Sequence, residues 1–363
     1  MFDNIISLIK PLDTKAMEKC QIRIDNLTKP LGSLHSFEHI ACQMAGITGY
    51  HRPKDLQKSI IVMAADHGIV AEGISMDPQS VTAERMIDCC QGRATIHVLA
   101  EHIAANLTLV DMGIATKMPF FAQMHNMRIA SGTKNIAQEA AMTREQGRRA
   151  ITVGSQIAQR EIEKGCRILG LGAIGIGGDV SSVGIISCYS AKKVAELFGS
   201  DAKIVDELLN KKITVLERAL KVNQPDTEDP IDVLCKIGGF EIAGLVGVIL
   251  GAAAGGAVIV LDGLATVAAA LIAMKIAPQV KDYLIASHFA VEPAYSEALD
   301  IMKVPGYLHL DMHLGDGTGA IFGISLLNAS LHMLNDMKTF GDAAVAVAQD
   351  GPGALKQSHD IKE

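Results

Sequence analysis

Short apolar runs rich in β-branched residues recur along the chain, and each run ends in glycine, small or acidic residues. The clearest runs are "SIIVMAADHG" (59–68), "LTLVDMG" (107–113), "RILGLGAIG" (167–175) and "AVIVLDG" (257–263). The stretches between them are long enough for helices, as at 80–103. Strands that are apolar on both faces and alternate with helices indicate a parallel sheet covered on two sides. The pattern therefore predicts an α/β fold with a doubly wound, mostly parallel sheet.

The ends of these strands also indicate where a ligand would bind. Ligands of doubly wound sheets bind beyond the carboxyl ends of the strands. The residues at or just after the four predicted strand ends are Asp66, Asp111, Ala173 and Asp262. We expect these four residues to gather at one rim of the sheet.

The terminal segments differ from this central region. A helical stretch precedes the first predicted strand, and the chain ends in the polar tail "GPGALKQSHDIKE". We predict a small helical subdomain built from residues 1–50 and 331–363, and a large Rossmann-like α/β domain over residues 51–330.

The longest apolar tract, 245–261, is shorter than a comfortable membrane span and is bracketed by Glu241 and Asp262. We interpret it as a buried helix that runs into a buried strand, and we expect no membrane association. The N-terminus has an acidic residue at position 3 and no cleavage-like motif, so we predict no signal peptide.

Composition and charge exclude further classes of function. The formal net charge is −7 with a pI near 5.9, and no Lys/Arg cluster stands out that would neutralise a phosphate backbone. We therefore expect no nucleic-acid partner. The seven cysteines include no CxxC pair, which favours reduced thiols and a cytoplasmic protein over a disulfide framework or a zinc site.

Two glycine-containing segments carry candidate chemistry. "AADHGIVAEGIS" (64–75) puts Asp66 and His67 at a strand end, although Asp-His-Gly is also ordinary turn chemistry. "LGDGTGA" (314–320) packs three glycines around Asp316, so the backbone can approach a ligand closely with a carboxylate among its amides. A plain turn explains this second segment equally well.

The histidines do not form a recognisable catalytic or metal motif. "SHFAVEP" (287–293) offers Ser287, His288 and Glu292, but no GxSxG elbow is present to support a hydrolase triad. His288 and His313 have no HExxH or clustered Cys/His spacing around them. We treat both as structural histidines and predict no metal site.

Several long motifs follow one another in an order that points to one family. They are "LTKPLGSLHSFEHIACQMAGI" (27–47), "AADHGIVAEGIS" (64–75), "GTKNIAQEAAMT" (132–143), "KVNQPDTEDPIDVLCKIGGFEIAGLVGVILGAA" (221–253), "LDG" (261–263), "ASHFAVEP" (286–293) and "LHLDMHLGDGTGA" (308–320). Together they resemble the nicotinate-nucleotide:dimethylbenzimidazole phosphoribosyltransferase family from about residue 20 to 330. The first motif departs from the usual family form at Leu31, where a second proline is common.

The resemblance implies a homodimer-like or pseudo-dimeric enzyme of cobamide (vitamin B12 type) assembly. Such enzymes take nicotinate mononucleotide, displace nicotinate at C1 of the ribose with an aromatic base or phenol, and release an α-ribotide. The reaction requires a seat for the 5′-phosphate, a pocket for a flat acceptor and a carboxylate that removes the acceptor's proton. It requires no metal and no cofactor.

The resemblance also implies roles for particular residues. Asp316 is the candidate general base, at a position where the family carries Glu. The candidate substrate-binding residues are Asp77, Arg85, Gly175, Gly177, Lys212 and Ser287. Shortening Glu to Asp withdraws the carboxylate by roughly 1.5 Å, and about 1 Å of misplacement can cost on the order of 10²-fold in rate. A bridging water would restore the reach.

The sequence of the predicted phosphate-binding loop departs most strongly from that of the family. The family's loop resembles Gly-Glu-Met-Gly-Ile-Gly-Asn-Thr-Thr, whereas residues 172–180 read "GAIGIGGDV", which places Asp179 among the amides. A second glycine-rich loop of the family is replaced here by a segment with Ser200 and Asp201. A carboxylate about 4 Å from one phosphate charge costs about 4 kcal/mol at an effective dielectric of about 20, whereas a helix N-terminus favours an anion by about 0.3–2 kcal/mol. Repulsion therefore dominates if Asp179 points inward, but Asp179 would be harmless if it capped the following helix.

Two interpretations follow from these departures. In the first, the chain is the degenerate, non-catalytic partner of a homologous subunit in a pseudosymmetric heterodimer, as suits the two-chain branch of the family that handles phenol or p-cresol. In the second, the chain is an active phosphoribosyltransferase that uses Asp316 directly or through water. Both interpretations assign phosphoribosyl transfer to the assembly.

Overall fold

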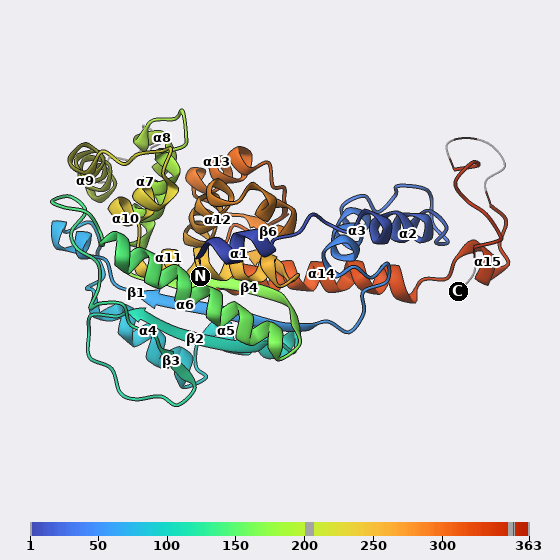
Figure 1. Cartoon of the computed structure of the whole chain (residues 1–363), viewed down its shortest axis with the longest axis horizontal. Helices are drawn as coiled ribbons and strands as arrows, with labels where there is room; N and C mark the ends of the chain where they lie inside the picture. Colours follow the sequence, from blue (N-terminus) through green and yellow to red (C-terminus); the bar gives the residue numbers. More distant parts are fainter. Residues whose placement is uncertain (1, 200–206, 348–350, 352, 362–363) are drawn as a thin grey trace.

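The strands form a single parallel sheet. The computed structural model describes residues 2–199, 207–347, 351 and 353–361. Within these residues the sheet has seven strands in the order β3-β2-β1-β4-β5-β6-β7, and every neighbouring pair is parallel (Figure 1). The strands are β1 (Gln57–Ala65), β2 (Asn106–Gly113), β3 (Met124–Asn126), β4 (Cys166–Ile174), β5 (Val258–Leu261), β6 (Leu284–Phe289) and β7 (Gly306–His309). The predicted parallel α/β fold is confirmed.

The four strands predicted from apolar runs are β1, β2, β4 and β5, and β1 and β4 lie side by side in the sheet. The chain builds β2 and β3 on one side of β1 and all later strands on the other side, so the strand order reverses between β1 and β4. Such a reversal opens a crevice at the carboxyl ends of the two central strands. The sequence interpretation missed β3, β6 and β7.

Helices cover both faces of the sheet, which explains why its strands are apolar on both sides. One face packs against α11 (Phe240–Ala254), which in turn packs against α6 (Arg144–Glu163) and α12 (Leu264–Ile276). The other face contacts α4 (Ser80–Cys90), α5 (Thr95–His102) and α14 (Thr318–Asp336). The stretch 80–103, which was predicted to be helical, contains α4 and α5.

The remaining helices lie around this framework. Beyond the carboxyl end of β4 are α7 (Gly178–Ser187), α8 (Val194–Phe198), α9 (Glu207–Asn223) and α10 (Pro230–Ile237). The others are α1 (Phe2–Leu8), α2 (Thr14–Asp25), α3 (Ser36–Thr48), α13 (Pro293–Met302), α15 (Phe340–Ala343) and the 3₁₀ segments η1 (Gly68–Glu72) and η2 (Pro278–Tyr283).

Helices from the two ends of the chain meet away from the sheet. A second, smaller apolar cluster joins α2 and α3 to the C-terminal end of α14, for example through Ile24 and Leu334. The Arg23 guanidinium donates to the Leu334 carbonyl at 2.8 Å, and Leu27 forms a β-bridge with Thr339. These contacts suit a subdomain of both termini, but its boundaries at 1–50 and 331–363 stay a prediction.

The apolar tract 245–261 has the predicted structure, because α11 ends at Ala254 and β5 begins at Val258 inside the core. In the part of the chain that the structure describes, we find no helix with the length and apolar character needed to cross a membrane.

Glycines allow α6 and α11 to pack with their backbones in contact. A Cβ atom added to Gly247 would lie 1.9 Å from the Ile151 carbonyl oxygen, and one added to Gly154 would lie 1.8 Å from the Gly244 carbonyl oxygen. Neither neighbour is a side chain that can turn away, so any larger residue must push the helices apart.

We predict that Gly247→Ala lowers the free energy of unfolding by about 3 kcal/mol, the upper part of the usual range for overpacking. Thermal or denaturant unfolding measures the effect. Gly263→Ala is the matched control, because its Cβ would meet nothing closer than Gly315 Cα at 3.4 Å. Equal stability of the two variants would contradict the close packing of α6 and α11.

Candidate functional site

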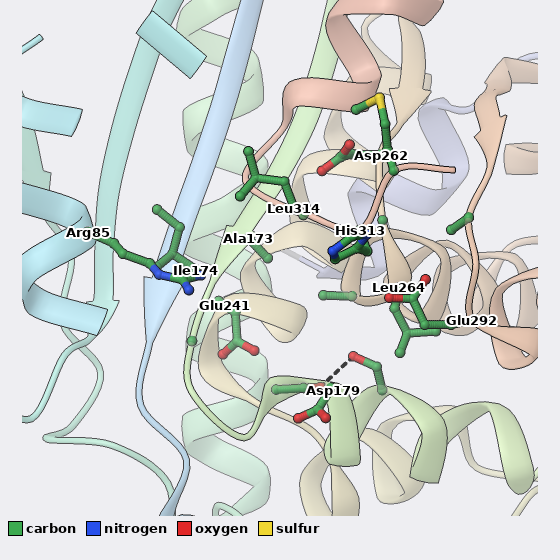
Figure 2. Close-up of a pocket in the computed structure, with 18 of the residues that line it drawn as sticks. Arg85, Ala173, Ile174, Asp179, Glu241, Asp262, Leu264, Glu292, His313 and Leu314 are labelled. Atoms are coloured by element: carbon green, nitrogen blue, oxygen red, sulfur yellow. Dashed lines mark hydrogen bonds between the residues drawn. The ribbon is translucent and has the colours of Figure 1, made fainter. Parts of the chain in front are cut away.

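A cleft of about 170 Å³ opens at the carboxyl ends of β4, β5 and β6 (Figure 2). Polar side chains converge on it from α4, α7, α11 and the carboxyl ends of β5, β6 and β7, and apolar residues form part of its wall. The lining residues with ionisable side chains are Arg85, Asp179, Glu241, Asp262, His288, Glu292 and His313. The site therefore lies at the reversal of strand order, where the fold predicts it.

The glycine-rich turn after β4 is packed against β1. Gly177 has φ 87° and is the N-cap of α7, a conformation that favours glycine. A Cβ atom added to Gly175 would lie 2.4 Å from the Ala65 carbonyl oxygen. The amide of Ile176 donates to Thr82 Oγ1 at 3.1 Å, so this amide is not free to bind an anion.

Asp179 lies in the first turn of α7, where it lines the cleft. It is not the cap of that helix, because Gly177 holds the cap position. Its carboxylate instead receives a bond from Lys212 Nζ at 2.5 Å, and the two side chains are 42% and 23% exposed. Lys212, which was predicted to bind the phosphate, is thus paired with Asp179, which stands where the family's phosphate loop has a neutral residue.

The deepest charged pair joins the ends of β1 and α11. His67 Nε2 lies 2.7 Å from Glu241 Oε1, and both side chains are 1% exposed. His67 Nδ1 lies 3.0 Å from the Ser181 hydroxyl on α7. Burial opposes the charge on His67, but the charge and hydrogen bond of Glu241, together with the charges of Asp66 and Asp179, outweigh burial and raise the pKa of His67 above its ordinary value.

Asp262, at the end of β5, holds the loop that carries the candidate base. Its two carboxylate oxygens accept from the Gly317 amide at 2.8 Å and the Gly319 amide at 2.6 Å. Complete burial raises the pKa of Asp262 to about 7, and the charge of Asp316 adds to the rise.

Asp316 itself does not line the cleft. Its Oδ1 accepts from the Thr318 hydroxyl at 2.5 Å and from the Thr318 amide at 3.3 Å. Its charge contributes to the raised pKa of Cys89, after the larger effect of burial.

Three further candidate residues near the cleft differ in their burial: Ser287, Asp77 and Arg85. Ser287 is fully buried behind it and bonds His288 Nδ1 at 2.7 Å. Asp77 and Arg85 are about half exposed, and their closest charged atoms are 4.0 Å apart. Figure 2 shows Arg85 across the cleft from Glu292.

Of the predicted substrate-binding residues, Arg85 and Gly175 line the cleft directly, whereas Gly177, Lys212, Ser287 and Asp77 adjoin its walls. The predicted rim is correct for Ala173 and Asp262. The expectations for Ser200 and Asp201 lie outside the described residues.

Asp111 lies at the same rim of the sheet, in register with Ala64 of β1, but it does not line the cleft. It lines a separate cavity beside β3 and pairs with Arg128 at 3.1 Å. The reason is the strand order, which places β2 on the other side of β1 from the cleft.

Sequence reasoning did not assign Glu241 to the site, and it named Glu292 only as part of a hydrolase triad that it rejected. Glu241 belongs to the long motif 221–253, and its position in the first turn of a glycine-preceded helix was the available signal. Burial raises the pKa of Glu292, whose Oε2 has no hydrogen-bond partner among the described residues.

The comparisons with known proteins agree with this geometry. A family model described as "Phosphoribosyltransferase" matches residues 9–345. The nicotinate-nucleotide–dimethylbenzimidazole phosphoribosyltransferase of Roseiflexus sp. (strain RS-1) is 41% identical over 346 residues, which cover 95% of this chain and 98% of the relative. The chain belongs to this phosphoribosyltransferase family.

Further relatives extend the agreement to the structure. The enzyme of the same name from Geobacter metallireducens is 40% identical over 345 residues, covering 95% of this chain and 98% of the relative. The crystal structure of the Thermus thermophilus enzyme has a TM-score of 0.86 and 32% identity, and the match covers 92% of this chain and 99% of that one. The predicted family is confirmed, and with it a pentosyltransferase of cobamide lower-ligand activation.

The raised pKa of Asp262 predicts a pH dependence of stability. Because the native state holds this proton more tightly than the unfolded chain, the carboxylate costs stability as the pH rises from about 4 to about 7. Relative to Asp262→Asn, which does not titrate, the wild type should lose up to about 4 kcal/mol across that window. Urea unfolding of both proteins at several pH values measures it. A constant difference between them would show that Asp262 is ionised throughout.

Proposed function

We propose that this chain is a subunit of a nicotinate-nucleotide:base phosphoribosyltransferase and that it is the non-catalytic partner in a pseudosymmetric heterodimer. The assembly would transfer the phosphoribosyl group of nicotinate mononucleotide to dimethylbenzimidazole, phenol or p-cresol. The observation that carries the proposal is the ion pair between Lys212 and Asp179 at 2.5 Å beside the phosphate loop.

The ion pair removes the charge that a phosphate needs. Lys212 already has a carboxylate partner and does not line the cleft, whereas Asp179 does. A phosphate at the N-terminus of α7 would have to displace this pair and would then face a carboxylate at close range. The repulsion of about 4 kcal/mol between unit charges about 4 Å apart exceeds what a helix terminus contributes.

The candidate base supports the same conclusion. Oδ1 of Asp316 accepts from Thr318, and Asp316 is not part of the cleft lining. A general base must come within hydrogen-bond reach of the proton that it removes, directly or through one water. Asp316 would need such a water or a rearrangement of its loop.

One observation favours the alternative, an active enzyme that uses Asp316. Thr318 bonds Oδ1 of Asp316, and the neighbouring Gly315 lines the cleft together with Arg85 of α4. An aromatic acceptor bound between α4 and the Asp316 loop would present its hydroxyl or ring nitrogen to that carboxylate.

Binding of nicotinate mononucleotide by the isolated chain tests the phosphate seat. We expect calorimetry to give a dissociation constant no tighter than the millimolar range. Asp179→Asn should bind the nucleotide at least about tenfold tighter, because it removes a like charge and releases Lys212. Glu139→Gln is a charge-matched control, because Glu139 is exposed and does not line the cleft. A micromolar constant for the wild type would contradict the proposal.

Catalysis by the two-chain complex tests the role of Asp316. We expect Asp316→Asn in this chain to leave phosphoribosyl transfer within a few-fold of the wild-type complex. Loss of a working general base would instead cost about 10²–10⁴-fold. Product formation from nicotinate mononucleotide with phenol or dimethylbenzimidazole measures both cases, and robust turnover by the lone wild-type chain would favour the alternative.

A further inference from the structure

The deep end of the cleft holds a carboxylate with unused acceptor capacity. Glu241 is 1% exposed and lines the cleft. Its Oε1 is bound to His67, whereas its Oε2 accepts from none of the residues that the structure describes. Each carboxylate oxygen can accept two hydrogen bonds, and a buried acceptor without a partner is unfavourable. This carboxylate therefore suits a ligand that supplies O–H or N–H donors.

The surroundings of Glu241 hold its carboxylate in place. His67 is itself fixed by the Ser181 hydroxyl at 3.0 Å. A Cβ atom added to Gly239 would lie 2.4 Å from the His67 ring and 2.5 Å from Glu241 Oε2, so the turn before α11 closes tightly over the pair. The acceptor is positioned before any ligand arrives.

The charge of the cleft determines which ligands match this acceptor. The carboxylates of Asp179, Glu241, Asp262 and Glu292 all line it, and Figure 2 shows Glu241, Asp179 and Glu292 around one opening. Among the described residues of the lining, the one arginine is Arg85, which lies across from Glu292 and 4.0 Å from another carboxylate. Such a site repels a phosphate and favours a ligand that carries positive charge and hydroxyl groups.

The remaining wall of the cleft is apolar. It contains Leu264, Ala265, Ala290, Met312 and Leu314. Apolar walls with a few convergent polar groups are typical of sites for flat organic rings.

We propose that this cleft binds a pyridinium riboside that lacks the 5′-phosphate, and that the ribose hydroxyls donate to Glu241. A single acidic side chain that accepts from ribose hydroxyls is a common mode of ribose recognition. The positive pyridinium ring suits the acidic lining, and the apolar wall covers its face. The inference rests on the proposed function, because it assumes that the chain has lost the phosphate seat but kept a sugar-binding site.

Calorimetry on the full-length chain tests the inference with three probes: nicotinamide riboside, whose pyridinium charge has no ring carboxylate beside it, nicotinamide mononucleotide and the 2′,3′-dideoxy form of the riboside. We expect the riboside to bind about tenfold tighter than the nucleotide and at least about tenfold tighter than its dideoxy form. Glu241→Gln should weaken riboside binding by about tenfold or more, whereas the exposed control Glu139→Gln should bind like the wild type.

Thermal unfolding shows whether Glu241→Gln folds. If this variant does not fold, binding of the three probes to the wild-type chain tests the inference by itself. Equal binding of the riboside and its dideoxy form, the absence of riboside binding, or a folded Glu241→Gln with wild-type affinity would overturn the inference. None of these results would affect the proposed function. Tight binding of nicotinate mononucleotide would overturn the proposed function, and preference for nicotinamide mononucleotide over the riboside would overturn the inference.

Discussion

Buried carboxylates at the carboxyl ends of the strands hold the loops of this protein in place. Asp262 accepts from the amides of Gly317 and Gly319 and so ties the end of β5 to the start of α14. Glu241 joins α11 to the end of β1 through His67. A buried carboxylate is stable only where donors meet it, so each of these residues dictates the path of the chain segment that supplies its donors.

The same requirement gives the cleft its chemical character. Carboxylates that organise the loops also line the opening between them, and Lys212 is held in an ion pair with one of the lining carboxylates, Asp179. An acidic cleft on a fold whose family transfers phosphoribosyl groups has two consistent explanations: loss of phosphate binding, or a ligand that needs acceptors. The ion pair of Asp179 supports the first explanation, and the unpaired oxygen of Glu241 supports the second.

The close packing of α6 on α11 makes this arrangement possible. Because glycines such as Gly247 let the helix backbones touch, α11 can lie on the sheet with its N-terminus, and therefore Glu241, at the rim where β1 ends. Displacement of α11 would move Glu241 away from His67. Packing far from the cleft thus sets the geometry inside it.

The sequence by itself determined the parallel sheet, because strands buried on both faces must be largely apolar, as β1, β2, β4 and β5 are. It also determined the family, through long motifs in a fixed order. It did not show β3 or β7, which are short, or β6, which was interpreted only as part of a motif. Tertiary structure alone decided which charges meet: the partner of Asp179 is 33 residues away and that of His67 is 174 residues away. The sheet order also separates Asp111 from the cleft, since every predicted strand end looks alike until pairing places it on one side of β1 or the other.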